Sequence, residues 1–192
     1  RGRGRLILNP GGQATIREDV VFEGSGIHTG QQCRVVVHGA PAGSGIVFLT
    51  GGRRIKAWPA NVVDTARGTS LGDGGEKVIL VEHLMAALAG MGVDNAECEV
   101  SGPEPPALDG SALAFAEGLR AAGIVKQGRE RRVVHVRGVE CVAKGDAVMV
   151  AAPAETFEAV CLLRFDHRLI GMQAFSFSGD AEAFLSAVAG AR

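Results

Sequence analysis

The pattern that most constrains the fold of this chain is a run of short strands followed by helices, which occurs twice. Segments rich in β-branched residues and bounded by Gly or Pro predict the strands of the first pass, at 19–23, 33–38, 46–49 and 96–100. The second pass has predicted strands and one closing helix, at 133–136, 148–151, 158–165 and 181–188. Runs of strands followed by helices favour an α+β fold, in which helices cover one face of each sheet.

Two helices are predicted in the first pass. The helix over 78–91 carries one apolar stripe at spacings of three and four, made of Val81, Leu84, Leu88 and Met91. The other helix runs over 112–122, where Asp109 and Ser111 are candidate caps and Gly123 is the stop signal. Both helices are therefore expected to pack an apolar face on the sheet.

Composition limits how such a core is built and which partners it excludes. The chain has 8 Phe, 1 Trp and no Tyr, so stacking platforms for nucleic-acid bases are not expected. Its 20 basic and 21 acidic residues leave a net charge of −1, which also predicts no nucleic-acid partner. No apolar run is long enough for a transmembrane segment. We expect a cytoplasmic protein, and the sequence leaves its oligomeric state open.

The same pattern suggests how the chain is divided. Residues 1–14 form a basic, glycine-rich lead without periodicity, which is expected to be flexible. A first α+β domain is expected over 15–127, followed by an incomplete second α+β domain over 128–192. The four cysteines form no CxxC pair and are expected to be small buried residues, not disulfides: Cys33, Cys98, Cys141 and Cys161.

Glu82 and His83 are the residue pair with the most chemical content. They stand near the start of the first predicted helix, where the helix dipole favours a carboxylate. An ionised Glu beside an imidazole suits a base next to a metal ligand. Most such pairs on helix surfaces have no such role, and no second histidine follows four residues later, as the standard zinc hydrolase motifs require.

Two loops offer further polar groups. His28 lies in a loop with three glycines, where backbone can approach a ligand closely, although a plain turn between strands explains it equally well. The segment over 64–69 offers Thr65 and Arg67 to a phosphate or a sugar, and it would serve equally as a capped turn. The proline-rich segment over 103–106 is most simply a rigid connection into the second helix.

In chain order, these segments resemble the UDP-3-O-acyl-N-acetylglucosamine deacetylase family, the zinc amidases of bacterial lipid A synthesis. The blocks that carry the resemblance are GSGIHTG at 24–30, VDT at 63–65, VEHLMAALAGMGVDN at 81–95, LDGS at 108–111 and FDHRLIG at 165–171. The resemblance runs from about residue 14 to residue 192. Its long helix block is highly specific, and chance agreement over all the blocks is implausible.

The resemblance implies two similar α+β domains with the active site between them. It implies Zn²⁺ as the cofactor and a UDP-linked acylated amino sugar as the substrate, which loses its N-acetyl group as acetate. It also implies Glu82 as the general base and His83 as a zinc ligand, with His28 as a possible ligand of a second zinc. Phe165 would stack on the uracil. Thr65 and Arg67 are the other substrate-binding candidates.

This sequence departs from the family pattern in ways that affect activity. The family's other two zinc ligands, in an HKxxDxxGD motif, and its general-acid histidine do not occur in these 192 residues. The chain alone is therefore expected to be inactive. Arg168 replaces a usual proline, and Ala66 stands where a larger acyl-contacting residue is usual. Two alternatives remain: a short non-catalytic homologue that binds a UDP-sugar or a protein, and a structural or regulatory partner of the full-length enzyme.

Overall fold

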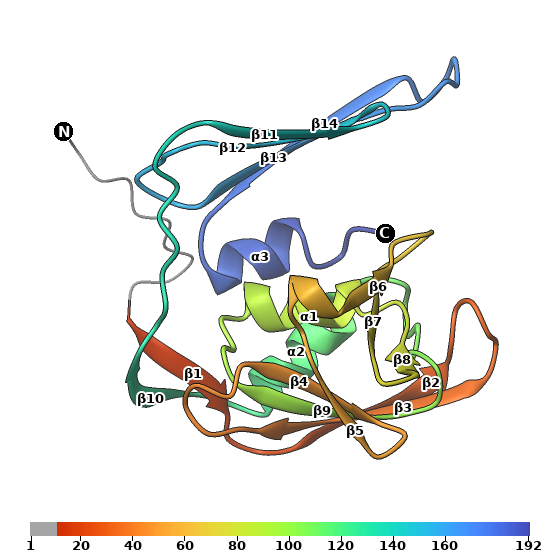
Figure 1. The fold of residues 1–192 in the computed structure, drawn as a ribbon, viewed down its shortest axis with the longest axis vertical. Helices are drawn as coiled ribbons and strands as arrows, with labels where there is room; N and C mark the ends of the chain where they lie inside the picture. The colour runs from red at the N-terminus through yellow and green to blue at the C-terminus, as the bar shows by residue number, and fades with distance from the viewer. Residues whose placement is uncertain (1–10) are drawn as a thin grey trace.

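The computed structural model describes residues 11–192 and has a layered α+β architecture, which confirms the predicted fold class (Figure 1). Within that range it contains three α-helices and fourteen β-strands. Of the flexible lead predicted over 1–14, residues 1–10 lie outside the described residues. Residues 12–14 are not an irregular flexible segment, because Gly12–Ile16 forms strand β1 and the Ala14 side chain is fully buried.

The first layer is a five-stranded sheet with the order β2-β3-β9-β4-β5. Its central strand, β9, runs antiparallel to β3 and parallel to β4, so it joins two hairpins into one sheet. The four strands predicted in the first pass are confirmed, and the short strand β5 adds an edge that was not predicted. The bounds are β2 (Val20–Ser25), β3 (Gln32–Gly39), β4 (Ile46–Thr50), β5 (Arg53–Lys56) and β9 (Ala96–Ser101).

Alternation along β9 gives this sheet one buried face. Cys98 and Val100 point into the core. Glu97 and Glu99, which alternate with them along the strand, lie on the opposite face. There Glu97 pairs with Arg54, so charged pairs cover the outer side of the sheet. Burial raises the pKa of the Cys98 thiol to about 12, which makes it a poor nucleophile.

Helices α1 (Glu82–Gly90) and α2 (Leu113–Ala121) cover the buried face of this sheet (Figure 1). The predicted apolar stripe is confirmed, because all four of its residues are buried: Val81, Leu84, Leu88 and Met91. The predicted helix start at residue 78 is wrong. Val78 ends a strand, and Leu80 has a left-handed backbone with φ of 55°, so helical geometry begins only at Glu82.

The stop predicted at Gly123 is confirmed, whereas the N-cap of α2 is Ala112, which makes no side-chain cap, and the candidate caps Asp109 and Ser111 stand just before it. The Ser111 hydroxyl accepts a hydrogen bond from the Leu113 backbone N–H at 3.1 Å, and Asp109 in turn accepts from Ser111. After the helix, Gly123 adopts a φ of 77°, which glycine tolerates without strain. The helix packs on the sheet through Phe115, whose ring centroid lies 4.8 Å from that of Phe22.

A small sheet that was not predicted lies beside the start of α1. It has the order β6-β7-β8 and follows a 3-10 turn, with bounds η1 (Pro59–Asn61), β6 (Val62–Asp64), β7 (Ser70–Asp73) and β8 (Glu76–Val78). The turn between β6 and β7 is fixed to the helix start, because the Val81 N–H donates to the Thr69 carbonyl at 3.1 Å. This sheet therefore sets the position of the predicted 64–69 loop.

Strand β10 (Ile124–Glu130) pairs antiparallel with β1 and crosses the boundary predicted between residues 127 and 128. The domain boundaries themselves stay a prediction. The strand predicted over 133–136 is wrong: residues 131–137 have no regular structure, and Val134 is exposed. A β-branched run without a neighbouring strand to pair with does not form a sheet.

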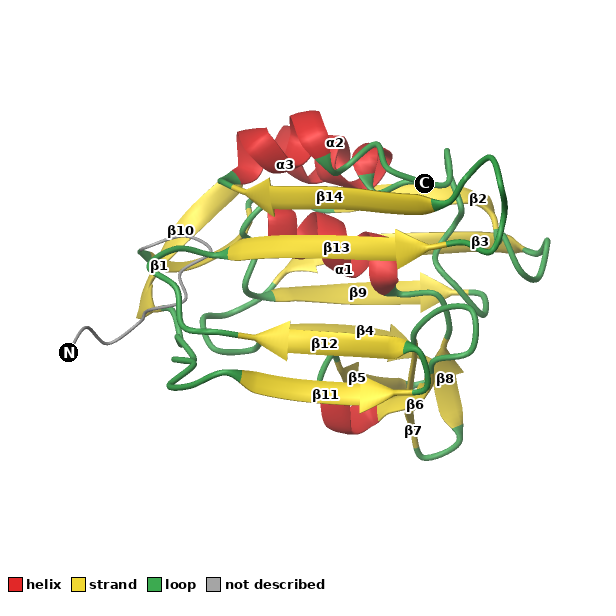
Figure 2. Cartoon of the chain, turned by 90° about the horizontal axis from the view of Figure 1, so that it is seen from above, coloured by secondary structure: helices red, strands yellow, loops and turns green. Residues whose placement is uncertain are grey.

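The second layer consists of two hairpins that lie over the helices, as Figures 1 and 2 show. The predicted strands at 148–151 and 158–165 and the closing helix are confirmed, whereas β11 and β14 were not predicted. The bounds are β11 (Glu140–Lys144), β12 (Ala147–Ala151), β13 (Glu158–Arg164), β14 (Met172–Ser178) and α3 (Ala181–Ala187). The buried Phe184 of α3 packs on Gly90 of α1, where an added Cβ would lie 2.4 Å from the ring.

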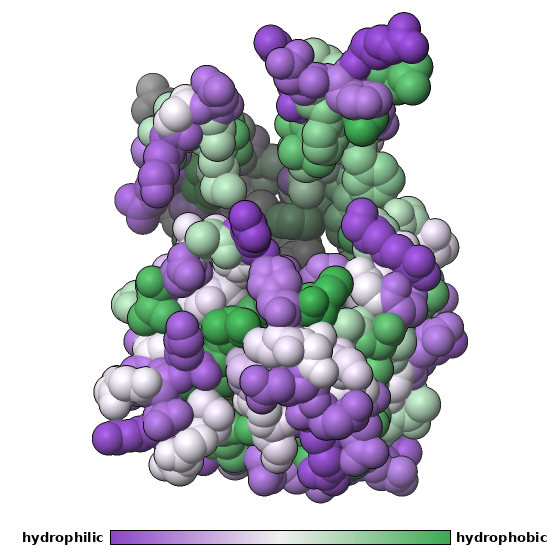
Figure 3. Space-filling model, turned by 90° about the vertical axis from the view of Figure 1, so that its right-hand side faces the viewer, coloured by the Kyte–Doolittle hydropathy of each residue, from purple (hydrophilic) through white to green (hydrophobic). Residues whose placement is uncertain are grey.

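The strands of this second layer are almost entirely exposed. Figure 3 shows apolar surface on the two upper lobes, and the exposed residues include Val150, Val160, Leu162 and Phe175. The prediction of buried cysteines therefore holds for Cys33 and Cys98 and is wrong for two others, Cys141 and Cys161, which lie on these exposed strands. No helix within residues 11–192 is long and apolar enough to cross a membrane.

Candidate functional site

A cavity of about 200 Å³ lies at the N-terminal end of α1, where four segments distant in sequence meet. Its walls are the glycine-rich loop with His28, the turn with Arg67, the start of α1 with Glu82 and His83, and the segment that begins at Glu104. The structure thus brings four of the predicted site residues to one place.

Glu82 is the first residue of α1, and its side chain is half-buried in the cavity wall. One carboxylate oxygen, Oε2, accepts a hydrogen bond from the Thr69 backbone N–H at 2.9 Å. A negative charge in the first turn also interacts favourably with the helix dipole. Among the described residues no donor binds the other oxygen, Oε1, so that atom is free to accept a hydrogen bond from a ligand.

The turn that holds Glu82 has an unusual backbone. Arg67 has a φ of 59° and Leu80 a φ of 55°, and both residues line the cavity. Non-glycine residues in the left-handed region cost of order 1 kcal/mol and concentrate at functional sites. Between them, Gly68 lies so close to the helix start that a Cβ would be 2.3 Å from Leu80 Cδ2 and 3.0 Å from Glu82 Oε1. A side chain at Gly68 would therefore displace the Leu80 side chain and crowd the carboxylate.

His83 follows Glu82 on α1 and lines the same cavity. Its side chain is half-buried. Within residues 11–192, no hydrogen bond or ion pair engages its imidazole. An imidazole in this position can bind a metal ion or a polar ligand from the cavity.

His28 reaches the cavity from the turn after β2, and its position depends on Glu104. The backbone N–H of His28 lies 3.2 Å from Glu104 Oε1, and the N–H of Thr29 lies 2.8 Å from the same oxygen. The Glu104 side chain is completely buried. Sequence reasoning missed this residue and assigned its segment to a rigid connection. No sequence spacing reveals it, because its donors lie 75 and 76 positions away in the chain.

Two predicted site residues do not line the cavity. Thr65 is exposed on the turn after β6, where the Asp64 carboxylate accepts from the Ala66 N–H at 2.9 Å, as expected for a capped turn. Phe165 lies at the end of β13 with 46% of its surface exposed, and its N–H donates to the Gly171 carbonyl at 2.9 Å. The proposed roles of both residues in substrate binding stay predictions.

The cavity holds polar groups of the kind that bind metals, yet they do not form a complete set. In the part of the chain that the structure describes, no group of three or more His, Cys, Asp or Glu side chains is placed to hold a metal ion. Glu104 is already engaged by the His28 loop, and one oxygen of Glu82 is engaged by Thr69. A catalytic zinc takes about three protein ligands, so these residues alone do not fit a complete zinc centre.

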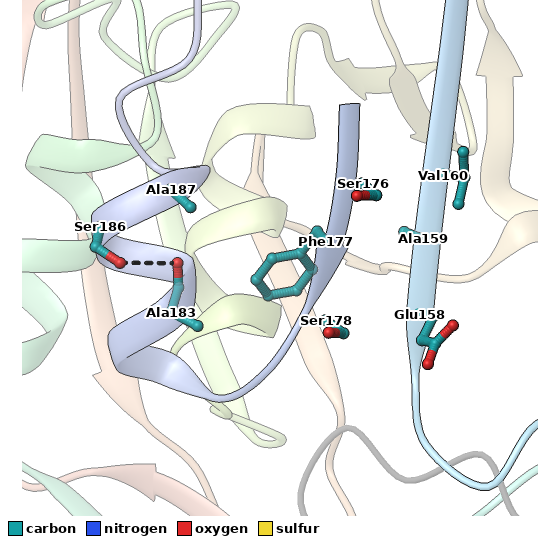
Figure 4. Close-up of a pocket in the computed structure, with 9 residues that line it drawn as sticks. All are labelled: Glu158, Ala159, Val160, Ser176, Phe177, Ser178, Ala183, Ser186 and Ala187. Carbon is teal, nitrogen blue, oxygen red and sulfur yellow. Dashed lines mark hydrogen bonds between the residues drawn. The ribbon is translucent and has the colours of Figure 1, made fainter. Parts of the chain in front are cut away.

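A second cavity, of about 380 Å³, lies between α3 and the β13–β14 hairpin (Figure 4). Its lining consists mainly of Ala, Ser and apolar side chains, with Glu158 as the one titratable group. The Ser186 hydroxyl donates to the helix backbone at the Glu182 and Ala183 carbonyls, so it carries no activating base. The cavity at the start of α1 is therefore the candidate active site.

Comparisons with known proteins show the family of this chain. The family model described as LpxC: UDP-3-O-acyl N-acetylglycosamine deacetylase matches residues 13–192. A UDP-3-O-acyl-N-acetylglucosamine deacetylase of Phenylobacterium zucineum is 41% identical over 94% of this chain and 64% of its own length. One of Myxococcus xanthus is 38% identical over 94% of this chain and 59% of its own length.

A third relative of the same name, from Geotalea uraniireducens, is 36% identical over 90% of this chain and 57% of its own length. The chain thus spans about three fifths of the length of the curated relatives it matches. The family match covers β1 through α3, including every segment that lines the cavity. This chain belongs to the LpxC family of UDP-3-O-acyl N-acetylglycosamine deacetylases.

Proposed function

We propose that this chain supplies the Glu82–His83 part of the active site of a deacetylase that removes the N-acetyl group of a UDP-3-O-acyl-N-acetylglucosamine in lipid A synthesis. The observation that carries the proposal is the single cavity that gathers Glu82, His83, His28 and Arg67. The names of the relatives support the substrate class. The expected cytoplasmic location stays a prediction from the sequence.

In this proposal Glu82 is the general base. Its free oxygen, Oε1, accepts a proton from a water molecule as the water oxygen attacks the acetamide carbonyl carbon. The carbon–nitrogen bond then breaks, acetate leaves, and the sugar nitrogen takes up a proton to become a free amine. The Thr69 N–H holds the other carboxylate oxygen, Oε2, so the base keeps its orientation. The guanidinium of Arg67 at the cavity wall suits the diphosphate of the substrate.

Zn²⁺ is proposed as the cofactor on the basis of family membership, with His83 as one ligand. The absence of a competing partner for its imidazole among the described residues supports this assignment. His28 is the candidate for a second metal position. Because the described residues do not complete a catalytic zinc set, we expect the chain alone to bind zinc weakly and to release no acetate.

A second candidate function is non-catalytic binding of a UDP-sugar. The observation that favours it is the same incomplete ligand set beside an otherwise well-formed cavity. In that case Arg67 and the backbone around His28 would bind the nucleotide sugar without hydrolysis. The two candidates differ in one measurable product, which is free acetate.

The test is a hybrid in which residues 13–192 of this chain replace the aligned part of the Phenylobacterium zucineum relative. The deacetylase proposal expects acetate release by the hybrid, near-complete loss with Glu82→Gln at unchanged zinc content, and full activity with the surface control Glu99→Gln. Equal turnover by the Glu82→Gln hybrid at equal zinc loading would refute the base assignment. A folded hybrid that binds the UDP-sugar and releases no acetate supports the binding function instead.

Titration calorimetry of the 192-residue chain with zinc tests the expectation for the chain alone. Weak binding together with no acetate release is the expected result. Tight one-to-one binding with turnover would show that the ligand set lies in residues other than those assigned here.

A further inference from the structure

We propose that Glu104 is a positioning residue of the cavity, whose buried carboxylate holds the turn at 26–30 so that His28 lines the same cavity as Glu82 and His83. The contacts of Glu104 stand independently of any reaction. Their significance for catalysis rests on the proposed deacetylase function.

Among residues 11–192, the hydrogen bonds of the Glu104 side chain all go to one short turn. Its Oε1 accepts from the Thr29 N–H at 2.8 Å and from the Thr29 hydroxyl at 2.7 Å. The His28 N–H lies 3.2 Å from Oε1 and 3.4 Å from Oε2. Each of these groups brings a hydrogen toward the carboxylate, whose oxygens accept hydrogen bonds. The carboxylate therefore fixes the backbone at two consecutive residues, one of which carries the cavity imidazole.

The turn is shaped to admit this carboxylate. A Cβ on Gly26 would lie 2.2 Å from Glu104 Oε1 and 2.6 Å from its Cδ, so only glycine allows the approach. The turn closes on itself, because the Gly30 N–H donates to the Gly26 carbonyl at 3.0 Å. Gly30 adopts a φ of 66°, which favours glycine. The Glu104 carboxylate thus lies against the inner side of the turn, in contact with Gly26, His28 and Thr29.

The segment that carries Glu104 is tied on both sides. Before it, the Pro103 carbonyl accepts from the Ile79 N–H at 3.0 Å, which links it to the connection between β8 and α1. After it, the Ala107 N–H donates to the Ser25 carbonyl at 2.9 Å, at the end of β2. Glu104 therefore connects the segment leading into Glu82 and His83 with the turn that carries His28. Movement of the turn that carries His28 relative to the segment that carries Glu104 requires the hydrogen bonds of the Glu104 carboxylate to break.

Burial of a carboxylate is costly unless hydrogen bonds compensate for the loss of water. Glu104 has an exposed fraction of 0%, and the residue lines the cavity. Glutamine has nearly the same size, but it replaces one accepting oxygen by an NH₂ group that donates. The Glu104→Gln variant keeps the packing and one accepting oxygen, removes the negative charge, and places an NH₂ group at the second oxygen position, where it faces the His28 N–H. It therefore tests the hydrogen bonds separately from the volume.

The experiment measures residue-resolved amide hydrogen exchange by NMR on the 192-residue chain, together with the ring signals of His28. In Glu104→Gln we expect the His28 and Thr29 amides to exchange roughly tenfold faster or more, and the His28 ring signals to shift. Amides of β3 and β9 should keep their rates. The surface control Glu99→Gln, on the outer face of β9, should change neither the turn amides nor the ring signals.

Thr29→Val and Thr29→Ser provide a second test that leaves the carboxylate in place. Loss of the hydroxyl in Thr29→Val should accelerate exchange at the turn, and Thr29→Ser should restore the original rates. Unchanged turn amides in Glu104→Gln and Thr29→Val would overturn the proposal. Equal acceleration across β3 and β9, or unmoved His28 ring signals, would also overturn it, because Glu104 would then only stabilise the fold. Since no substrate is used, these outcomes are separate from those of the deacetylase test.

Discussion

Replacement of Asn95 by alanine is expected to lower the free energy of unfolding by about 3 kcal/mol. Asn95 lies between α1 and β9 with 1% of its surface exposed. Its Nδ2 donates to Gln13 Oε1 at 3.0 Å and to Gln127 Oε1 at 2.7 Å. Its Oδ1 accepts from the N–H groups of Gly43 at 3.1 Å and Gly45 at 2.8 Å. One amide thus joins β1, β10 and the loop before β4.

The size of the expected loss in unfolding free energy depends on which hydrogen bonds each partner of Asn95 keeps in the alanine variant. The Gly45 N–H and Gln127 Oε1 lose the hydrogen bond to Asn95 and keep no other protein partner among the described residues. Orphaned groups of this kind cost at least about 1 kcal/mol each. The Gly43 N–H and Gln13 Oε1 still bind each other at 2.7 Å, so their lost contacts contribute only about 0.5 kcal/mol each.

Urea unfolding followed by the fluorescence of Trp58, the single tryptophan, measures the loss in the first layer. The urea concentration at the midpoint of unfolding should fall, while the slope of the unfolding free energy against urea concentration stays the same. Asn61→Ala is the matched control, because Asn61 makes one exposed hydrogen bond to the Lys56 carbonyl and should cost less than about 1 kcal/mol. A loss for Asn95→Ala no larger than that of the control would refute the argument from the network.

Other consequences of the structure can be measured directly. In an active hybrid, Glu82→Gln should lower kcat by about 10²–10⁴-fold at unchanged zinc content, whereas His83→Ala should lower the zinc content found by mass spectrometry. Hydrogen bonds from the Ser111 hydroxyl, and to a smaller extent from its N–H, lower the pKa of Asp109. The stabilisation from these bonds is present at neutral pH and disappears as the pH falls through that lowered pKa. The difference in melting temperature between wild type and Ser111→Ala should therefore shrink in acid. The exposed apolar strands should make the chain self-associate in sedimentation equilibrium, and Leu162→Lys should reduce the association.

The apolar stripe predicted α1, and β-branched runs bounded by Gly or Pro predicted six strands, β2, β3, β4, β9, β12 and β13, whereas β10 and β14, of seven residues each, were not predicted. The stripe of α1 is buried as expected, from Val81 to Met91. Short strands gave no such signal: β6 and β8 have three residues each, too few for a period to repeat. The start of α1 was placed too early, because nothing in the sequence marks the left-handed backbone at Leu80.

The candidate site was predictable where its residues are neighbours in sequence and unpredictable where they are not. Glu82 and His83 are adjacent, so a helix start was enough to place both at one cavity. Glu104 acts on a turn 75 positions away, and its role exists only after β2 and the segment following β9 lie side by side. Gly68 falls within the segment over 64–69 that the sequence offers as a turn, whereas its close approach to Glu82 depends on the small sheet that orients the turn.

The long block over 81–95 combines two different physical requirements. Its first residues, including Glu82 and His83, face the cavity. Its last residues have no contact with the cavity: Asp94 accepts from the Ala14 N–H at 2.8 Å and forms a two-point ion pair with Arg131, both contacts at 2.6 Å. These bonds hold β1 and the chain after β10 against the end of α1. The first residues of this block therefore line the candidate active site, whereas its last residues attach the chain after β10 to the end of α1.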